Sequence, residues 1–256
     1  MNGLIRSEWT KLRSLRSTWL TLVGTAVLCV GLGTLIARGQ ASAHVRAAPA
    51  DRPAFDPTAL SLSGIFLAQL TIGVLGVLVM TSEYSTGMIQ SSLTVVPRRG
   101  RLYVAKICSF GAFALLSGQV IGFASFLLGQ ALIAGAGAPH TTLADPGVFR
   151  AVVGSGLYLA LLGLLGLALG AMVRATAGAL ALLVTITLLV RLVSATLPAT
   201  WQQRVNQYWP TSAGTRITTV VPDSHSLAPW AGFGVLCAFT AACLLGGFAL
   251  LRARDV

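Results

Sequence analysis

The sequence predicts an all-α membrane protein with six transmembrane helices. Of its 256 residues, 55% are hydrophobic and only 10% are charged, whereas soluble domains carry roughly 25% charged residues. Six apolar stretches reach the length of about 20 residues that a helix needs to cross ~30 Å of hydrocarbon. A water-soluble enzyme is therefore nearly ruled out. The net charge of +11 is better explained by cytoplasmic loops than by binding to nucleic acid.

The predicted spans divide the chain into short segments. They cover residues 18–37, 60–81, 107–134, 151–173, 176–197 and 230–251. No segment between them approaches the roughly 50 residues that an independent domain needs, so residues 1–256 are predicted to form one transmembrane domain. All ten prolines lie outside the spans, which predicts continuous helices instead of the broken helices of many ion-coupled transporters. The glycine pairs Gly118/Gly122 and Gly166/Gly170 predict close helix packing.

The distribution of cations predicts the orientation. With the amino terminus inside, eleven of the 18 Lys and Arg residues lie in inner segments and six lie in outer segments, while Arg191 lies within a span. Cytoplasmic loops of membrane proteins carry the excess of Lys and Arg. Both termini are therefore predicted to be cytoplasmic.

Residues 1–17 precede the first span and predict a basic amphipathic helix. At 100° per residue, one arc holds Leu4, Ile5, Trp9, Leu12 and Leu15, and the other holds Arg6, Thr10, Lys11, Arg13 and Ser14. A helix of this kind lies along the cytoplasmic surface of the membrane. Glu8 and Arg16 interrupt the apolar arc, which indicates contact with protein. The alternative is a plain positively charged anchor.

The inner loop between the second and third spans, residues 82–106, carries a second amphipathic pattern. Its polar stripe consists of Glu83, Thr86, Gln90 and Thr94. We expect a short helix at the cytoplasmic face that ends near Pro97, because proline disfavours helical geometry in the residue before it. The cations that follow would meet lipid headgroups. Such a helix, joined to two spans, can pass a push from a soluble partner into the membrane; an ordinary charged loop is the alternative.

A few polar residues lie inside the predicted spans. They are Gln69, Gln119, Gln130, Thr185, Thr187 and Arg191. Buried polar groups bond to neighbouring helices first, so we expect most of them to stabilise packing. Gln69, Gln119 and Arg191 are the candidates for lining a substrate path. We expect Arg191 to extend toward the headgroups or to pair with Asp223, because an unpaired guanidinium in hydrocarbon costs ~3 kcal/mol or more.

The sequence shows none of the motifs expected of a catalytic site. No Asp or Glu lies within the predicted spans, which disfavours an ion-coupled transporter. A P-loop needs a lysine directly after a glycine, and the only lysines, Lys11 and Lys106, follow other residues. The four cysteines and three histidines show no metal-ligand spacing. Any ATP hydrolysis must therefore come from another chain.

Three short segments carry a resemblance to a known family. The run Ser7-Glu8-Trp9-Thr10-Lys11-Leu12-Arg13-Ser14 resembles the opening of type-2 ABC exporter permeases, especially those of high-GC actinobacteria. The runs 83–87 and 97–101 with Lys106 are similar to the coupling loop of that family, and residues 208–214 resemble its segment before the last span. The number of spans, their predicted orientation and the loop lengths resemble those of this family over the whole chain. Met88 departs from the family, where threonine is frequent.

The resemblance implies a non-catalytic permease subunit in the plasma membrane. A second permease chain, identical or paralogous, would complete the translocation path, and a separate ABC ATPase would bind ATP and Mg²⁺. The residues implied to contact the ATPase are Glu83, Tyr84, Thr86, Gly87, Met88 and Gln90, with Glu83 paired to a cation of the ATPase or to Arg99 or Arg101. The implied anchors at the inner interface are Trp9, Lys11, Arg13, Arg98, Arg99, Arg101 and Lys106.

Two questions stay open at the level of sequence. The acid-free path suits a drug, a peptide or a lipid, without choosing among them. The outer loop 198–229 places Trp201, Val205, Tyr208 and Trp209 on roughly one helical face, a pattern that leaves open whether the loop forms a short interfacial helix or a re-entrant one. A six-span assembly or immunity factor without pump activity is the main alternative function, and an ion-coupled transporter is a weaker one.

Overall fold

The computed structural model describes residues 2–14, 16–48, 55–85, 99–221 and 226–253, and these are helical with short connections. Six helical runs are long and apolar enough to cross a membrane, as predicted. They are α2 (Arg16–Arg46), α4 (Ile65–Ser85), α6 (Arg99–Gly135), α7 (Val148–Val173), the run α8 (Thr176–Val184), η2 (Thr185–Leu189) and α9 (Val190–Ser194), and α12 (Pro229–Ala253). The predicted all-α fold is confirmed.

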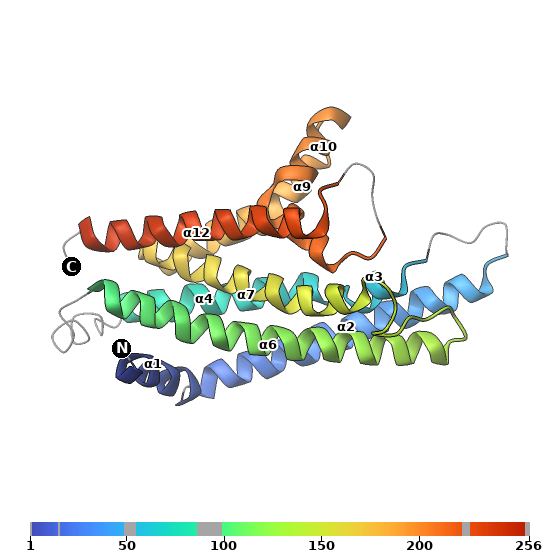
Figure 1. Ribbon diagram of the computed structural model, residues 1–256, viewed down its shortest axis with the longest axis horizontal. Coiled ribbons are helices and arrows are strands. Elements are labelled where there is room, and N and C mark those ends of the chain that lie inside the picture. The colour runs from blue at the N-terminus through green and yellow to red at the C-terminus, as the bar shows by residue number, and fades with distance from the viewer. Residues whose placement is uncertain (1, 15, 49–54, 86–98, 222–225, 254–256) are drawn as a thin grey trace.

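The amino-terminal helix α1 (Asn2–Ser14) lies at one end of the bundle. The start of α6 and the carboxyl end of α12 lie at the same end, on the left of Figure 1. We call it the terminal end. The short helix α3 (Pro57–Ser61) lies toward the opposite end, where the side chain of Asp56 accepts hydrogen bonds from the first free backbone N–H groups of that helix.

Several helices extend beyond the predicted spans. Helix α2 runs to Arg46 rather than to residue 37, α4 continues past residue 81 to Ser85, and α6 begins at Arg99 rather than at residue 107. Hydropathy identifies only the part of a helix that lies in hydrocarbon, whereas the backbone hydrogen bonds of the helix continue into the polar residues that follow. As a result, Glu83 and Lys106 lie within long helices and not in a loop.

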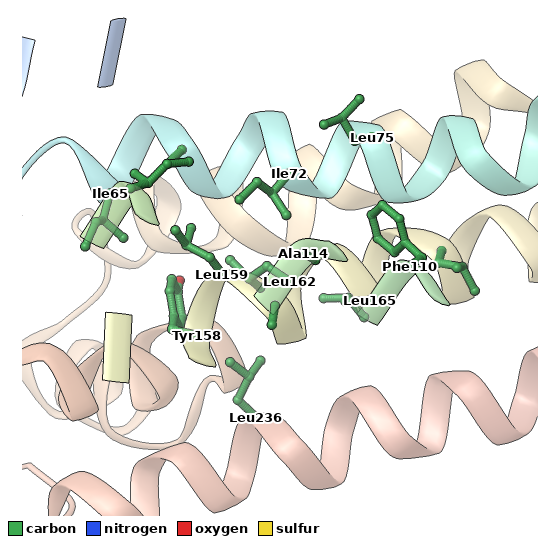
Figure 2. Packing of buried hydrophobic residues seen from close by; sticks show 14 of the residues in the cluster. Ile65, Ile72, Leu75, Phe110, Ala114, Tyr158, Leu159, Leu162, Leu165 and Leu236 are labelled. Atoms are coloured by element: carbon green, nitrogen blue, oxygen red, sulfur yellow. The ribbon is translucent and has the colours of Figure 1, made fainter. Parts of the chain in front are cut away.

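Helix α7 forms the centre of the bundle. It packs against α4, α6 and α12, and most of its membrane-spanning length is buried. Figure 2 shows Ile72 of α4, Phe110 of α6 and Leu236 of α12 around Leu162 of α7. All four side chains are essentially inaccessible. A helix that is hydrophobic all round belongs in such a buried position.

Glycines bring α7 into backbone contact with its neighbours. A Cβ atom on Gly166 would collide with the carbonyl oxygen of Gly73 in α4, and one on Gly170 would lie 3.0 Å from the carbonyl oxygen of Val77. A Cβ atom on Gly118 of α6 would lie 2.9 Å from the carbonyl oxygen of Gly156. The predicted role of both glycine pairs in packing is confirmed, because neither interface has space for a side chain.

The fifth span departs from the predicted continuous α-helix. It stays helical throughout, but residues Thr185–Leu189 form a π-helix although the span contains no proline. The indole Nε1 of Trp209 donates to the carbonyl oxygen of Ile186 at 2.8 Å, and the hydroxyl of Thr211 donates to the same oxygen at 3.3 Å. A π-turn shifts the backbone hydrogen-bond register, and residues from the following segment bond to the shifted carbonyl.

The segment after the fifth span contains an exposed helix and a buried one. Helix α10 (Ala199–Tyr208) has no buried residue, as expected for an interfacial helix, and projects away from the bundle in Figure 1. Helix α11 (Pro210–Gly214) and the 3₁₀ turn η3 (Thr215–Thr218) instead return into the bundle between α7 and α12. Trp209 and Thr211, which begin this segment, bond to Ile186, eight residues before the end of α9 at Ser194. At 1.5 Å of rise per residue, that bond lies about 12 Å along the helix from its end.

Candidate functional site

A buried ion cluster joins three helices at the terminal end. The Nζ atom of Lys106 lies 2.7 Å from Oε2 of Glu8 and 2.8 Å from Oε1 of Glu83. The Nζ atom of Lys11 lies 2.9 Å from Oε1 of Glu8 and 3.4 Å from Oε1 of Glu83. These four residues, called the ion cluster below, include every lysine and every glutamate of the chain.

Each helix contributes to the ion cluster for a local reason. Glu8 and Lys11 are three residues apart on α1, so their side chains lie on one face. Glu83 is in the last turn of α4 and Lys106 is in the second turn of α6. The cluster therefore connects the amphipathic helix to both helices that flank residues 86–98.

Three of the four residues of the ion cluster are removed from solvent, and Lys11 is half-buried. Glu8 and Lys106 are each 3% exposed and Glu83 is 6% exposed. Burial raises the pKa of Glu8, but the charge and hydrogen bonds of Lys106 and Lys11 outweigh it and hold that pKa below its ordinary value. Burial lowers the pKa of Lys11, and its bonds to the two carboxylates reverse this effect and raise that pKa. The ionised forms are therefore favoured together.

These shifts predict how the docking of α1 depends on pH. Because the pKa of Glu8 is lowered, its stabilising contribution is present above its ordinary value of 4.5 and is lost as pH falls through the lowered value. Because the pKa of Lys11 is raised, its contribution is present below 10.5 and is lost as pH rises through the raised value. We expect α1 to stay docked between these limits and to detach in acid.

A spin label on α1 measures this pH dependence. Gly3 has open space around it, so Gly3→Cys in a background without the four native cysteines places a label that makes no new contact. Its mobility should be constant at neutral pH and should rise below the lowered pKa of Glu8. The Glu8→Gln variant should show high mobility at neutral pH already. Equal mobility in both proteins at all pH values would contradict the assigned role of the ion cluster.

The predicted ATPase-coupling residues fall partly outside the described chain. Thr86, Gly87, Met88 and Gln90 lie in residues 86–98, outside the described residues. Tyr84 is described: the guanidinium carbon of Arg174 lies 5.3 Å from the centre of its ring, which is a cation–π arrangement.

Arg174 itself occupies a special position. It connects α7 to α8 and has a positive φ of 59°, which costs a non-glycine residue conformational energy. Its Nε and Nη2 atoms are buried and have no hydrogen-bond partner in the described part of the chain, and the same holds for Oε2 of Glu83. Buried polar atoms normally have a partner. Arg174 was missed at the sequence level, where it counted only as one inner cation.

The structure corrects two sequence-level expectations about the ion cluster. Glu83 was expected to pair with a cation of the ATPase or with Arg99 or Arg101, but it pairs with Lys106 and Lys11. Lys106 was expected to act as an anchor at the inner interface, but its ammonium group is buried between two carboxylates. The expected protein contact of Glu8 is confirmed.

The other predicted anchors lie around the cluster. Trp9 is half-buried and packs against the hydrophobic core, and Arg101 is exposed. The side chains of Arg13, Arg98 and Arg99 are outside the described part of the structure. Their expected contact with headgroups stays a prediction.

The polar residues inside the spans bond mostly to neighbouring helices. Gln69 accepts a hydrogen bond from Tyr158 at 2.7 Å, and Nε2 of Gln119 donates to the carbonyl oxygen of Val153 at 3.0 Å. Gln130 donates to the carbonyl oxygen of Pro57 at 2.9 Å. Thr185 and Thr187 donate to carbonyl oxygens one turn earlier in their own helix. These contacts fit the expected packing role and leave a role in the substrate path as a prediction.

Arg191 differs from these residues because it is exposed and lines a pocket. The pocket holds about 350 Å³ and lies between the end of the fifth span, α10 and the returning α11–η3 segment. The expected partner Asp223 lies outside the described residues.

Comparison with known proteins agrees with this architecture. The model of the family described as ABC-2 family transporter protein matches residues 4–191, which is well over half of the chain and includes most of α1, the ion cluster and the first five spans up to Arg191. No curated protein matches the sequence. The chain is a multi-pass membrane protein, with six candidate spans in the part that the structure describes, and it belongs to the ABC-2 transporter family, whose members are permease subunits of ABC transporters.

Proposed function

We propose that this chain is the permease subunit of an ATP-driven exporter that receives its energy from a separate ATPase docked at the terminal end, in the cytoplasm. The observation that carries the proposal is the ion cluster, because it fixes α1 to both helices that flank residues 86–98. On this proposal the ATP and Mg²⁺ belong to the partner. A second permease chain, identical or paralogous, completes the path.

The ion cluster gives a route by which a push at residues 86–98 moves the bundle. Strong interactions between buried charges resist separation, so the end of α4 and the start of α6 move together with α1. Helix α4 is in backbone contact with α7 through Gly73 and Gly166, and a close-packed interface passes displacement on without compressing. ATP binding by the partner would tilt these helices as one unit and open the path outward.

The residues proposed to contact the ATPase are Thr86, Gly87, Met88 and Gln90, with Tyr84 at their edge. Glu83 has a different proposed role, because its 6% exposure and its two lysine partners make it a positioning residue. Oε2 of Glu83 and two nitrogens of Arg174 are buried and have no partner in the described residues, and the Arg174 guanidinium lies over the ring of Tyr84. They are available to bond residues 86–98 or the ATPase in the assembled complex.

The proposal is tested by reconstituting the chain with candidate ATPases that carry a P-loop. One ATPase should co-purify with the permease, and its rate of ATP hydrolysis should change in the permease's presence. Gly87→Trp should abolish both effects while membrane insertion is retained. Gly24→Trp is the matched control, because open space surrounds Gly24. Glu83→Ala should keep the ATPase bound but remove the permease's effect on ATP hydrolysis.

The outcomes separate the competing functions. If no P-loop ATPase co-purifies, or if Gly87→Trp has no effect on a co-purifying ATPase, the coupling assignment is wrong. Transport that collapses with the proton gradient while ATP remains would favour the ion-coupled alternative. Insertion without any effect on ATP hydrolysis would favour an assembly or immunity factor.

A further inference from the structure

The pocket beside Arg191 has the composition of an anion site. Two guanidinium groups line it, from Arg191 at the end of the fifth span and from Arg216 in η3. The amide side chains of Gln202 and Asn206 face it from α10. No acidic residue of the described chain lines it. We call it the two-arginine pocket; guanidinium and amide N–H groups are donors that suit phosphate and carboxylate oxygens.

A buried hydroxyl group provides an independent sign that a ligand binds in this pocket. Ser212 lines the pocket and is 8% exposed, and its Oγ atom has no hydrogen-bond partner in the described residues. The neighbouring hydroxyl groups differ, since those of Ser194 and Thr215 donate to backbone carbonyl oxygens. A buried hydroxyl without a partner is costly, and an anion in the pocket would accept its proton.

The surroundings of the pocket indicate an amphipathic ligand. Leu192 and Val193, directly after Arg191, are 70% and 56% exposed, and Trp201, before Gln202, is 61% exposed. These residues belong to the outer part of a membrane-spanning helix and to the interfacial helix that follows it. A cationic pocket next to an exposed apolar surface accommodates a charged headgroup and acyl chains at the same time. Its volume of about 350 Å³ is in the usual range for small-ligand sites, roughly 300–1,000 Å³.

We propose that the two-arginine pocket binds the phosphate headgroup of an anionic lipid, with the acyl chains on the exposed surface of α9. The guanidinium groups of Arg191 and Arg216 bind the phosphate oxygens, and Ser212 donates the remaining hydrogen bond. Gln202 and Asn206 contact the polar part of the headgroup. This site is independent of the coupling to an ATPase, so its failure would leave the proposed function unaffected.

Native mass spectrometry of the detergent-purified full chain tests the site. Phosphatidylglycerol should bind at least about tenfold more tightly to the native protein than to Arg191→Gln or Arg216→Gln, because each variant removes charge-assisted hydrogen bonds to the phosphate. Arg204→Gln is the matched control: Arg204 is an exposed arginine of α10 that does not line the pocket, and its replacement should leave the affinity unchanged. Thermal unfolding of each variant checks that it is folded.

Further arms of the experiment identify the source of the phosphate and test a rival occupant. Inorganic phosphate and soluble glycerol phosphate should fail to displace the lipid at equal concentration; equal displacement would mean that a free phosphate is the ligand and would overturn the lipid assignment. Equal binding of phosphatidylcholine would overturn the requirement for an anion. Unchanged affinity for the lipid in both arginine variants would overturn the site. The site would also be overturned if replacing Arg191 lowered the affinity for the lipid only in an Asp223→Asn background, because Asp223 would then be the native occupant of the pocket.

Discussion

Replacing Lys106 by methionine is expected to detach α1 from the bundle and to abolish the permease's effect on its ATPase. Lys106 bonds to both Glu8 and Glu83, so its removal leaves two buried carboxylates that only Lys11 can bond. Removing one partner of a buried ion pair costs about 3–5 kcal/mol, because the remaining charge stays buried without compensation. The mobility of a spin label at position 3 measures the detachment, and the rate of ATP hydrolysis measures the coupling.

Two further variants make this expectation specific. Arg101→Met is the matched control: it removes a cation from the same helix at an exposed position, and it should leave α1 docked. Lys106→Met combined with Glu8→Gln and Glu83→Gln should restore much of the docking, because no buried carboxylate is then left without a compensating charge. If Lys106→Met alone leaves both readouts at their native values, the ion cluster does not hold α1.

Gly166→Val is expected to cause a large loss of stability. A Cβ atom at this position would collide with the carbonyl oxygen of Gly73, and neighbouring atoms of the Gly73 backbone are also within contact distance. Backbone cannot rotate away as a flexible side chain can, so α4 and α7 would have to separate. Overpacking typically costs about 1–3 kcal/mol and occasionally more, and we expect at least about 3 kcal/mol here.

The native cysteines report this loss directly. Cys29 is 2% exposed, Cys237 and Cys243 are half-buried, and Cys108 is exposed. In a Cys108→Ser background, a thiol-reactive dye therefore gains signal mainly as the protein unfolds on heating. Gly24→Val is the control, because nothing lies within 4 Å of a Cβ atom at Gly24. A melting temperature for Gly166→Val that matches the control would show that α4 and α7 are not held in backbone contact.

The sequence predicted the elements that follow from local composition. Apolar length was sufficient to place all six spans, and the glycine spacing around Gly118 and Gly166 was sufficient to place two close interfaces. Three helix ends, those of α2 and α4 and the start of α6, extend four to nine residues beyond the prediction, because polar residues such as Glu83 and Arg46 continue a helix without adding to its hydropathy. The aromatic face of the segment after the fifth span left its form open, and the structure places an exposed helix there.

The parts that were missed depend on residues distant in sequence. Glu8 and Lys106 are 98 residues apart, and nothing in the local pattern of either indicates the other. One sequence signal was available: the chain has only two glutamates and two lysines, all in predicted inner segments. The absence of proline from the fifth span predicted a regular α-helix there. The π-helix was missed because the carbonyl oxygen of Ile186 is bonded by Trp209, which lies 23 residues later in the sequence.

The return of α11 into the bundle was missed for a similar reason. Arg150 was counted among the outer cations, but its guanidinium donates to the carbonyl oxygens of Ile217 at 3.0 Å and Thr219 at 2.9 Å. These carbonyls are at the end of η3, so Arg150 caps the segment that packs against α7. A sequence pattern identifies the charge of such a residue but not the backbone groups that it bonds.

Both lysines of the chain lie in the ion cluster, and this has a practical consequence for chemical labelling. Lys106 is inaccessible, so among lysine side chains an amine-reactive crosslinker or dye can attack only Lys11, whose side chain is 39% exposed. Acylation at that position would neutralise the ammonium group and weaken the junction between α1 and the bundle. Surface attachment through amines would therefore perturb the docking of α1, whereas a thiol introduced on α10 would be remote from the ion cluster.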